Sequence, residues 1–97
     1  MATYNTTKNV SMLVCFAGCN RRVVINTKKC TINKKDRTFT YKTLYKTEEG
    51  KTYLLTATSV NGSNGLKADV IVSNKSGKEI IAKRHNVDVR FGRYMYE

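Results

Sequence analysis

Two short segments carry most of the chemistry that this sequence offers, and both are basic. Residues 21–37 hold seven of the eighteen Lys and Arg residues and one acid, Asp36. Residues 83–96 interleave basic and aromatic side chains. The candidate contact residues are Arg21, Arg22, Lys28, Lys29, Lys34, Lys35, Arg37, Lys83, Arg84, Arg90, Arg93 and Tyr94.

Side chains of these types bind phosphate. Lys and Arg displace counterions from a nucleic acid, so the logarithm of the affinity falls with the logarithm of salt concentration by about 0.9 per contact on duplex DNA. Arginine beside exposed aromatic rings suits single strands, because bases stack on the rings while guanidinium groups hold the backbone. The pattern predicts nucleic-acid binding with limited sequence preference, and leaves open DNA or RNA and single or double strands.

Each basic segment also has a plainer interpretation. Residues 21–37 suit a solvated loop whose lysines protect an edge strand from aggregation. Phe91 is in phase with the apolar residues before it and is expected in the core, while Tyr94 and Tyr96 could fasten the C-terminus to the fold. Basic charge also steers a chain toward acidic proteins. The alternative function is therefore a small protein-binding module, an inhibitor or adaptor, that covers an acidic surface of a larger partner.

Three tyrosines raise the same choice between core and contact surface. Tyr41, Tyr45 and Tyr53 share faces with Phe39 and Leu55. We expect them to point inward with their hydroxyl groups at the rim. If that face were open instead, it would form a stacking platform for bases.

The sequence favours no enzyme, metal site or cofactor. His85 is the single histidine, and seven acids in the whole chain offer it no triad or carboxylate pair. With Cys15, Cys19 and Cys30 it could complete a Cys3His zinc site, but the spacing of the first two cysteines is wider than in a usual knuckle. Three cysteines are an odd number, so we expect free, buried thiols and no disulfide framework.

Two glycine-containing strings resemble ligand-binding loops only in spelling. Residues 62–65 have the GxxG pattern, but that clamp joins two helices and this string lies between two expected strands. Residues 76–79 lack the first glycine and the final Ser or Thr of a phosphate-binding loop. A small-molecule ligand is therefore not expected.

Composition limits the remaining possibilities. The 97 residues suffice for one domain, and a net charge of +11 favours anionic partners. No apolar run is long enough to span a membrane, and residues 1–8 do not look like a secretory signal, so we expect a cytoplasmic protein without membrane association. The lack of Pro and Trp beside many Lys and Asn suits an AT-rich source such as a low-GC bacterium, a phage or another virus.

From residue 37 onward the chain alternates between apolar and polar residues. Residues 38–46, 51–60 and 66–73 predict three strands, separated by turns that are rich in Gly and Asn. In the last strand the apolar residues move from even to odd positions between Ala82 and Val87. A bulge near His85 would absorb that shift and help the sheet to curl.

The N-terminal third is less regular. Residues 10–17 are mostly apolar and could form a buried strand or a short helix; we favour the strand. The β-branched residues of 21–26 predict a second strand, and residues 31–32 a short edge segment. We therefore expect a single all-β domain: an antiparallel meander barrel of about six strands, SH3-like or OB-like, with little or no helix. Residues 1–8 and 94–97 are expected to be flexible.

Overall fold

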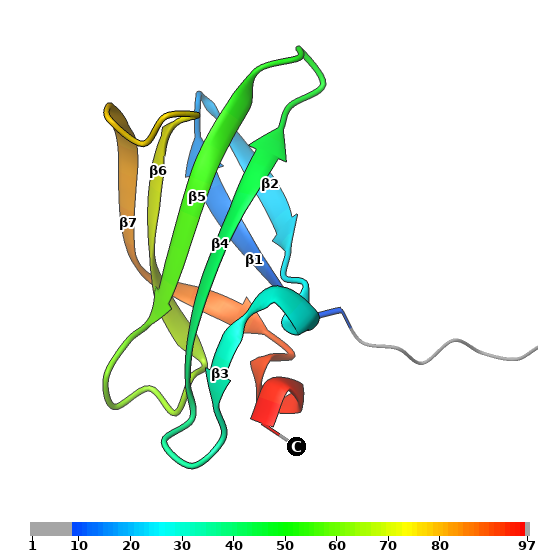
Figure 1. Ribbon diagram of the computed structural model, residues 1–97, viewed down its shortest axis with the longest axis vertical. Coiled ribbons are helices and arrows are strands. Elements are labelled where there is room, and N and C mark those ends of the chain that lie inside the picture. The colour runs from blue at the N-terminus through cyan, green and yellow to red at the C-terminus, as the bar shows by residue number, and fades with distance from the viewer. Residues whose placement is uncertain (1–8, 97) are drawn as a thin grey trace, which may run out of the picture.

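Seven antiparallel strands form one curled sheet in the computed structural model, which describes residues 9–96 (Figure 1). The strands are β1 (Ser11–Phe16), β2 (Cys19–Val24), β3 (Thr31–Asn33), β4 (Thr38–Lys46), β5 (Thr52–Ser59), β6 (Lys67–Asn74) and β7 (Ile80–Arg90). Two short 3-10 helices, η1 (Thr27–Lys29) and η2 (Gly92–Tyr96), complete the fold. The predicted all-β class is confirmed.

The order of the strands explains how the sheet curls into a half-barrel. It runs β2-β1-β7-β6-β5-β4-β3, so β3 to β7 form the predicted meander. β1 joins β7 through Ser11 opposite Arg90 and Met12 opposite Val89, and the β1–β2 hairpin lies behind β4 and β5 in Figure 1. There are seven strands where about six were expected, and the choice between an SH3-like and an OB-like barrel stays a prediction.

The core fills the inner face of the sheet. Phe16 on β1 lies edge-on against Tyr45 and Tyr53, with ring centroids 5.7 and 5.3 Å away. These contacts pack β1 across the interior onto β4 and β5. The inward placement of the tyrosines is confirmed: Tyr41 and Tyr53 are buried, and Tyr45 packs against the core. Their face is therefore not an open stacking platform.

A bulge in β7 lies where the sequence alternation shifts. Val70 is opposite Arg84, but Ala68 is opposite Val87, so β7 holds one extra residue at this point. Asn86 has a positive φ of 55°. The Asp69 carboxylate accepts a hydrogen bond from the Asn86 backbone N–H at 3.3 Å, which satisfies a group that the ladder leaves unpaired. The predicted bulge is confirmed.

The end of β7 differs from the prediction. Phe91 was expected in the core because it continues the alternation of Val87 and Val89. The strand instead ends at Arg90, and Phe91 takes a positive φ of 59° that turns the chain into η2. Phe91 is consequently only partly buried, and Met95 fills the core at this point.

The structure describes only some of the residues at the two chain ends for which we made predictions. Residues 1–8 and 97, which we expected to be flexible, lie outside the described residues. Residues 94–96 belong to η2, where Met95 is 4% exposed. In the described part of the chain, no helix is long and apolar enough to cross a membrane.

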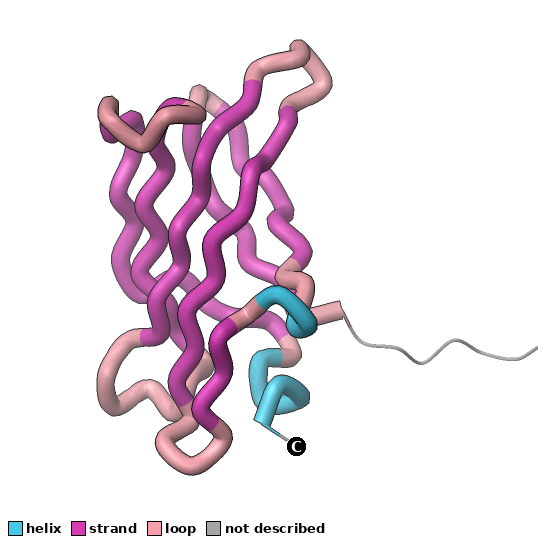
Figure 2. The backbone as a smooth tube through the Cα atoms, viewed as in Figure 1, coloured by secondary structure: helices cyan, strands magenta, loops and turns pink. Residues whose placement is uncertain are grey.

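One end of the half-barrel collects loops and both 3-10 helices (Figure 2). η2 contacts β3, and the Tyr96 hydroxyl donates a hydrogen bond to the Gly65 carbonyl at 3.5 Å. A Cβ atom at Gly65 would lie 2.7 Å from the Arg37 carbonyl oxygen and would overlap the Tyr96 ring. We call this end, formed by η1, the 34–37 turn, the 60–66 loop, the last residue of β7 and η2, the η2 end.

We predict that Gly65→Ala lowers the free energy of unfolding by about 2 to 5 kcal/mol. The substitution strains a residue with φ of +74° and forces a methyl group against Tyr96 and Arg37. Gly62→Ala is the matched control: its φ is +82°, but nothing lies within 4 Å of the new Cβ. Gly62→Ala should therefore cost only the conformational term, about 1 to 2 kcal/mol. Urea denaturation of both variants measures the difference. Equal losses of stability in the two variants would mean that the close approach of Tyr96 and Arg37 to Gly65 does not contribute.

Candidate nucleic-acid interface

Eight of the twelve predicted contact residues come together at the η2 end. They are Lys28 and Lys29 in η1, Lys34, Lys35 and Arg37 in the turn after β3, Arg90 at the end of β7, and Arg93 and Tyr94 in η2. Seven of the eight are cations, and all seven are exposed. Of the segments that bear them, the turn after β3 and η2 meet at Gly65, where Arg37 and Tyr96 both lie close, and η1 precedes β3 at the same end of the half-barrel (Figure 2).

Asparagine side chains shape the two lysine-bearing turns. Asn26 precedes η1, and its side chain accepts a hydrogen bond from the Lys28 backbone N–H at 3.1 Å. Asn33 does the same for the backbone N–H groups of Lys35 and Asp36, at 3.0 and 3.1 Å. Both are local Asx turns, in which the asparagine replaces backbone partners. The lysine side chains of both turns are exposed.

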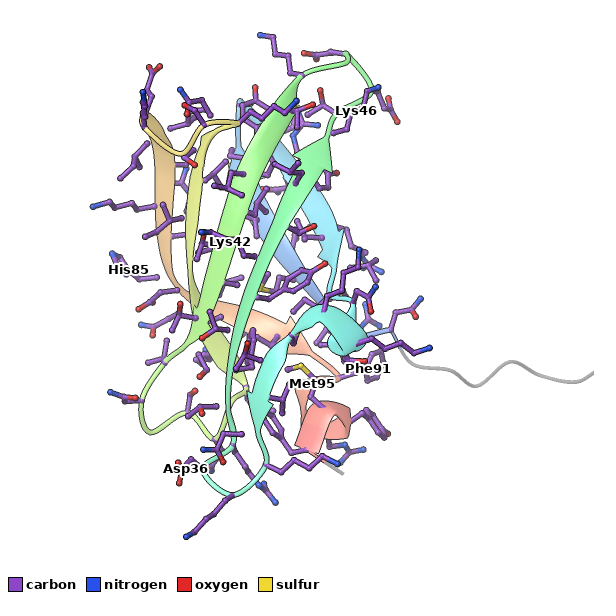
Figure 3. The ribbon with its side chains drawn as sticks, viewed as in Figure 1. Asp36, Lys42, Lys46, His85, Phe91 and Met95 are labelled. Atoms are coloured by element: carbon purple, nitrogen blue, oxygen red, sulfur yellow. The ribbon has the colours of Figure 1, made fainter. Side chains whose placement is uncertain are left out.

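The electrostatic character of this end is strongly positive. Asp36 is the single acid in the turn, and its carboxylate accepts a hydrogen bond from the Asn33 amide at 3.0 Å. In Figure 3 Asp36 lies at the tip of the turn, away from η2. Among the described residues of this end, one carboxylate accompanies seven cations, and the resulting excess of positive charge attracts polyanions.

Arginine and aromatic side chains pack together where β7 passes into η2. The Arg90 guanidinium carbon lies 5.2 Å from the centroid of the Phe91 ring, and that of Arg93 lies 5.1 Å from the Tyr94 ring. The two rings are 6.1 Å apart and tilted by 54°. Arg93 also donates a hydrogen bond to the Tyr94 hydroxyl at 3.2 Å. We call these four residues the arginine–aromatic cluster; Phe91 lies beside η2 in Figure 3.

A shallow hollow adjoins this cluster on the outer face of β2, β1 and β7. Its volume is about 350 Å³, and its lining residues are Ser11, Met12, Leu13, Arg22, Asp88 and Arg90. The Asp88 carboxylate pairs with the Lys67 ammonium group at 2.8 Å. Because Asp88 is paired, the arginines Arg22 and Arg90 make the hollow positively charged. We therefore include Arg22 in the candidate interface.

The sequence did not indicate Ser11 or Leu13 as part of a surface site. Both lie in an almost continuously apolar segment, which conceals the alternation of β1. Leu13 is opposite Arg22 and is 59% exposed, whereas Met12 and Val14 point into the core. The signal available in the sequence was the serine at position 11, which has the same phase as Leu13.

Arg21 and Arg84 lie elsewhere: each is opposite a buried valine on the neighbouring strand, with Arg21 half-buried and Arg84 exposed. Arg21 is opposite Val14, and its guanidinium carbon lies 5.3 Å from the centroid of the Phe16 ring. Its Nε atom is buried without a hydrogen-bond partner. Arg84 is opposite Val70, and its Nε donates to the Cys15 carbonyl at 2.9 Å. That bond links β7 to β1 beyond the two residue pairs of their ladder.

Lys83 also lies apart from the η2 end. It is exposed in the middle of β7 and faces Ile71 on β6. The two basic segments therefore converge in part: the ends of both segments meet, while Arg21, Lys83 and Arg84 serve other parts of the molecule. The interface that the structure brings together contains nine of the twelve predicted residues.

The cysteines are free, as expected, but the prediction that they are buried is wrong for two of them. Cys15 lies on the outer face of β1 and Cys19 at the hairpin end of β2, and both are exposed. Cys30 is partly buried and packs against the core. Within residues 9–96 no three His, Cys, Asp or Glu side chains are grouped to hold a metal ion.

Comparison with known proteins gives no further assignment. No protein family, curated protein or solved structure matches this chain. The interface therefore depends on its own geometry: two lysine-bearing turns, the arginine–aromatic cluster and the hollow between Arg22 and Arg90.

We predict that the three thiols react with maleimide at different rates. Cys15 and Cys19 are exposed, whereas burial raises the pKa of Cys30 to about 11 and keeps its thiol protonated at neutral pH. Mass spectrometry of the labelled native chain should show two fast additions and one slow one. Equal rates at all three sites would contradict this packing of Cys30.

The same thiol predicts a dependence of stability on pH. The raised pKa means that the folded chain keeps the Cys30 proton at pH values where the unfolded chain loses it. The contribution of this group to stability is complete below pH 9.0 and is lost as the pH rises toward about 11. Cys30→Ala should reduce the fall in stability over that interval, measured by urea denaturation against pH.

Proposed function

We propose that this protein binds nucleic acid without catalysing a reaction, and that it grips backbone phosphates with the basic residues of the η2 end. The observation that carries the proposal is the convergence of Lys28, Lys29, Lys34, Lys35 and Arg37 with the arginines of residues 90–93. A cytoplasmic location, as the sequence leads us to expect, would give the chain access to both RNA and DNA.

The arrangement of these cations favours an extended polyanion over a small anion. The cations lie on four separate segments around the end of the half-barrel, so they can contact several phosphates along one backbone. Each neutralised phosphate releases counterions, which makes binding dependent on salt concentration and tolerant of sequence. Limited sequence preference is therefore part of the proposal.

The arginine–aromatic cluster supports contact with unpaired bases as well as phosphates. Cation–π contacts hold the guanidinium groups of Arg90 and Arg93 in place before binding, which reduces the entropy lost on binding. Tyr94 is partly exposed in the same cluster. Aromatic side chains at such a position bind bases by stacking, whatever their sequence.

Two variants with the same change in net charge test where the phosphates bind. K28A/K29A/K34A/K35A removes four lysines of the η2 end, and K42A/K46A/K75A/K78A removes four exposed lysines elsewhere. We expect the first variant to weaken oligonucleotide binding by roughly a hundredfold at low salt, and to reduce the salt slope by about 0.7 to 0.9 per lost contact.

The second variant should show only the general effect of lower net charge, and its salt slope should stay close to that of the parent chain. Fluorescence anisotropy with single- and double-stranded DNA and RNA across a salt series measures both quantities. Equal losses in the two variants would mean that binding is spread over the surface. An unmodified chain that binds none of the oligonucleotides at low salt would reject the proposal.

Replacing Tyr94 by leucine tests the contact with bases. Tyr94→Leu keeps an apolar side chain but removes the aromatic stacking surface, which is worth about 1 to 3 kcal/mol per base. We therefore expect five- to a hundredfold weaker binding of single strands. Binding of blunt duplexes should change little, because their bases are already stacked. Equal effects on both substrates would assign Tyr94 a structural role in η2.

A further inference from the structure

The outer face of the sheet from β4 to β7 carries a row of apolar side chains in contact with solvent. The register places Leu44 opposite Leu54, Leu54 opposite Ser73, and Ser73 opposite Ile80, so the row crosses four strands and its member on β6 is a buried serine. Leu44 is 54% exposed and Ile80 51% exposed. Ile81, which follows in β7, is 43% exposed.

A second row beside the first ends in lysine on both sides. Lys42 is opposite Thr56, Thr56 is opposite Ile71, and Ile71 is opposite Lys83. Adjacent strands are about 4.8 Å apart, so the backbones of Lys42 and Lys83 are separated by roughly 14 Å. Figure 3 shows Lys42 and Lys46 along β4 on this side of the molecule. We call the two rows together, with Ile81, the outer apolar face.

These apolar residues do not stabilise the core of the described structure. Tyr53, Leu55 and Ala57 on the other side of β5 already fill the interior. The outer positions of the same strand are otherwise threonine, which is usual for a solvated face of an antiparallel sheet. Leucine and isoleucine gathered at such positions form the kind of patch that marks a contact surface.

Charge determines which partner fits. Asp69 is the acid in the next row of this face, and its carboxylate is already engaged with the Asn86 backbone and the His85 ring. The remaining charges of the two rows are Lys42 and Lys83. Two copies of this chain placed face to face would bring lysines together, whereas carboxylates on a partner would pair with them.

We propose that the outer apolar face docks a second protein whose contact surface has an apolar centre bordered by Asp and Glu. Leu44, Ile71 and Ile80 supply the apolar contact, and Lys42 and Lys83 fix the orientation by pairing with the acids. This surface shares no residue with the interface proposed for nucleic acid. A chain that binds with both surfaces would attach a nucleic acid to an acidic partner protein.

Selection from a displayed library of random peptides tests the proposal without a known partner. We expect the selected peptides to combine Leu, Ile or aromatic residues with Asp and Glu. L44S/I80S should weaken their binding about tenfold or more, because it removes the apolar contact at both ends of the row. Val24→Ser changes an equally exposed apolar residue, 52% exposed on β2, and should leave peptide binding unchanged.

Charge reversal tests the role of the lysines. The K42E/K83E variant should no longer bind an acidic peptide. The same variant should bind a version of that peptide in which the acids are replaced by lysine. Peptides without acidic enrichment, or equal losses in V24S and L44S/I80S, would overturn the proposal. Analytical sedimentation gives a further test. If the parent chain forms a dimer and L44S/I80S is a monomer, the surface binds a second copy of this chain, and the proposal is overturned.

The failure of this proposal is distinguishable from that of nucleic-acid binding. L44S/I80S removes no charge and lies outside the η2 end, so oligonucleotide affinity should stay the same in this variant. Loss of peptide binding with unchanged oligonucleotide affinity supports two separate surfaces. Parallel loss of both would mean that the substitutions disturb the fold, and intact urea denaturation curves serve as the control for that result.

Discussion

The pairing of β1 with the last residues of β7 is the contact on which both the curled sheet and the candidate interface depend. It comprises Ser11 opposite Arg90 and Met12 opposite Val89, with the Arg84 side chain as an additional link to β1. This short ladder joins the N-terminal hairpin to the meander. Because it does so at the end of β7, it places Arg90 beside Arg22 and the η2 segment beside β3.

Local backbone features make that short ladder possible. The bulge at Asn86 lets β7 bend from the plane of β6 toward β1, and the positive φ of Phe91 then directs the chain into η2. Gly65 permits the close approach of η2 to the 34–37 turn. A residue with a side chain would separate these segments and disperse the cations that they carry. Charge convergence here is therefore a consequence of close packing together with hydrogen bonds such as that from the Tyr96 hydroxyl to the Gly65 carbonyl.

The two proposed surfaces use different physical effects. The η2 end gathers cations from several segments beside two aromatic rings, which suits a long, flexible polyanion and gives strong dependence on salt. The outer apolar face has few charges and a central row of Leu and Ile, which suits a protein surface that excludes water. Arg21 belongs to neither surface: its stacking on Phe16 takes a cation into the rim of the core, where its Nε lacks a partner.

The sequence by itself determined the strands from β4 to β7, the inward tyrosines and the bulge near His85, because alternation with a period of two is a local property that each strand carries alone. It also identified the basic segments, since charge is read directly from residue types. Which of those charges meet was decided only by the tertiary structure. Arg84 and Arg93 look equivalent in sequence, yet Arg84 lies in β7 and donates a hydrogen bond to the Cys15 carbonyl, whereas Arg93 lies in η2 against the Tyr94 ring. The convergence depends on pairing between segments separated by many residues, and no local pattern specifies such a pairing.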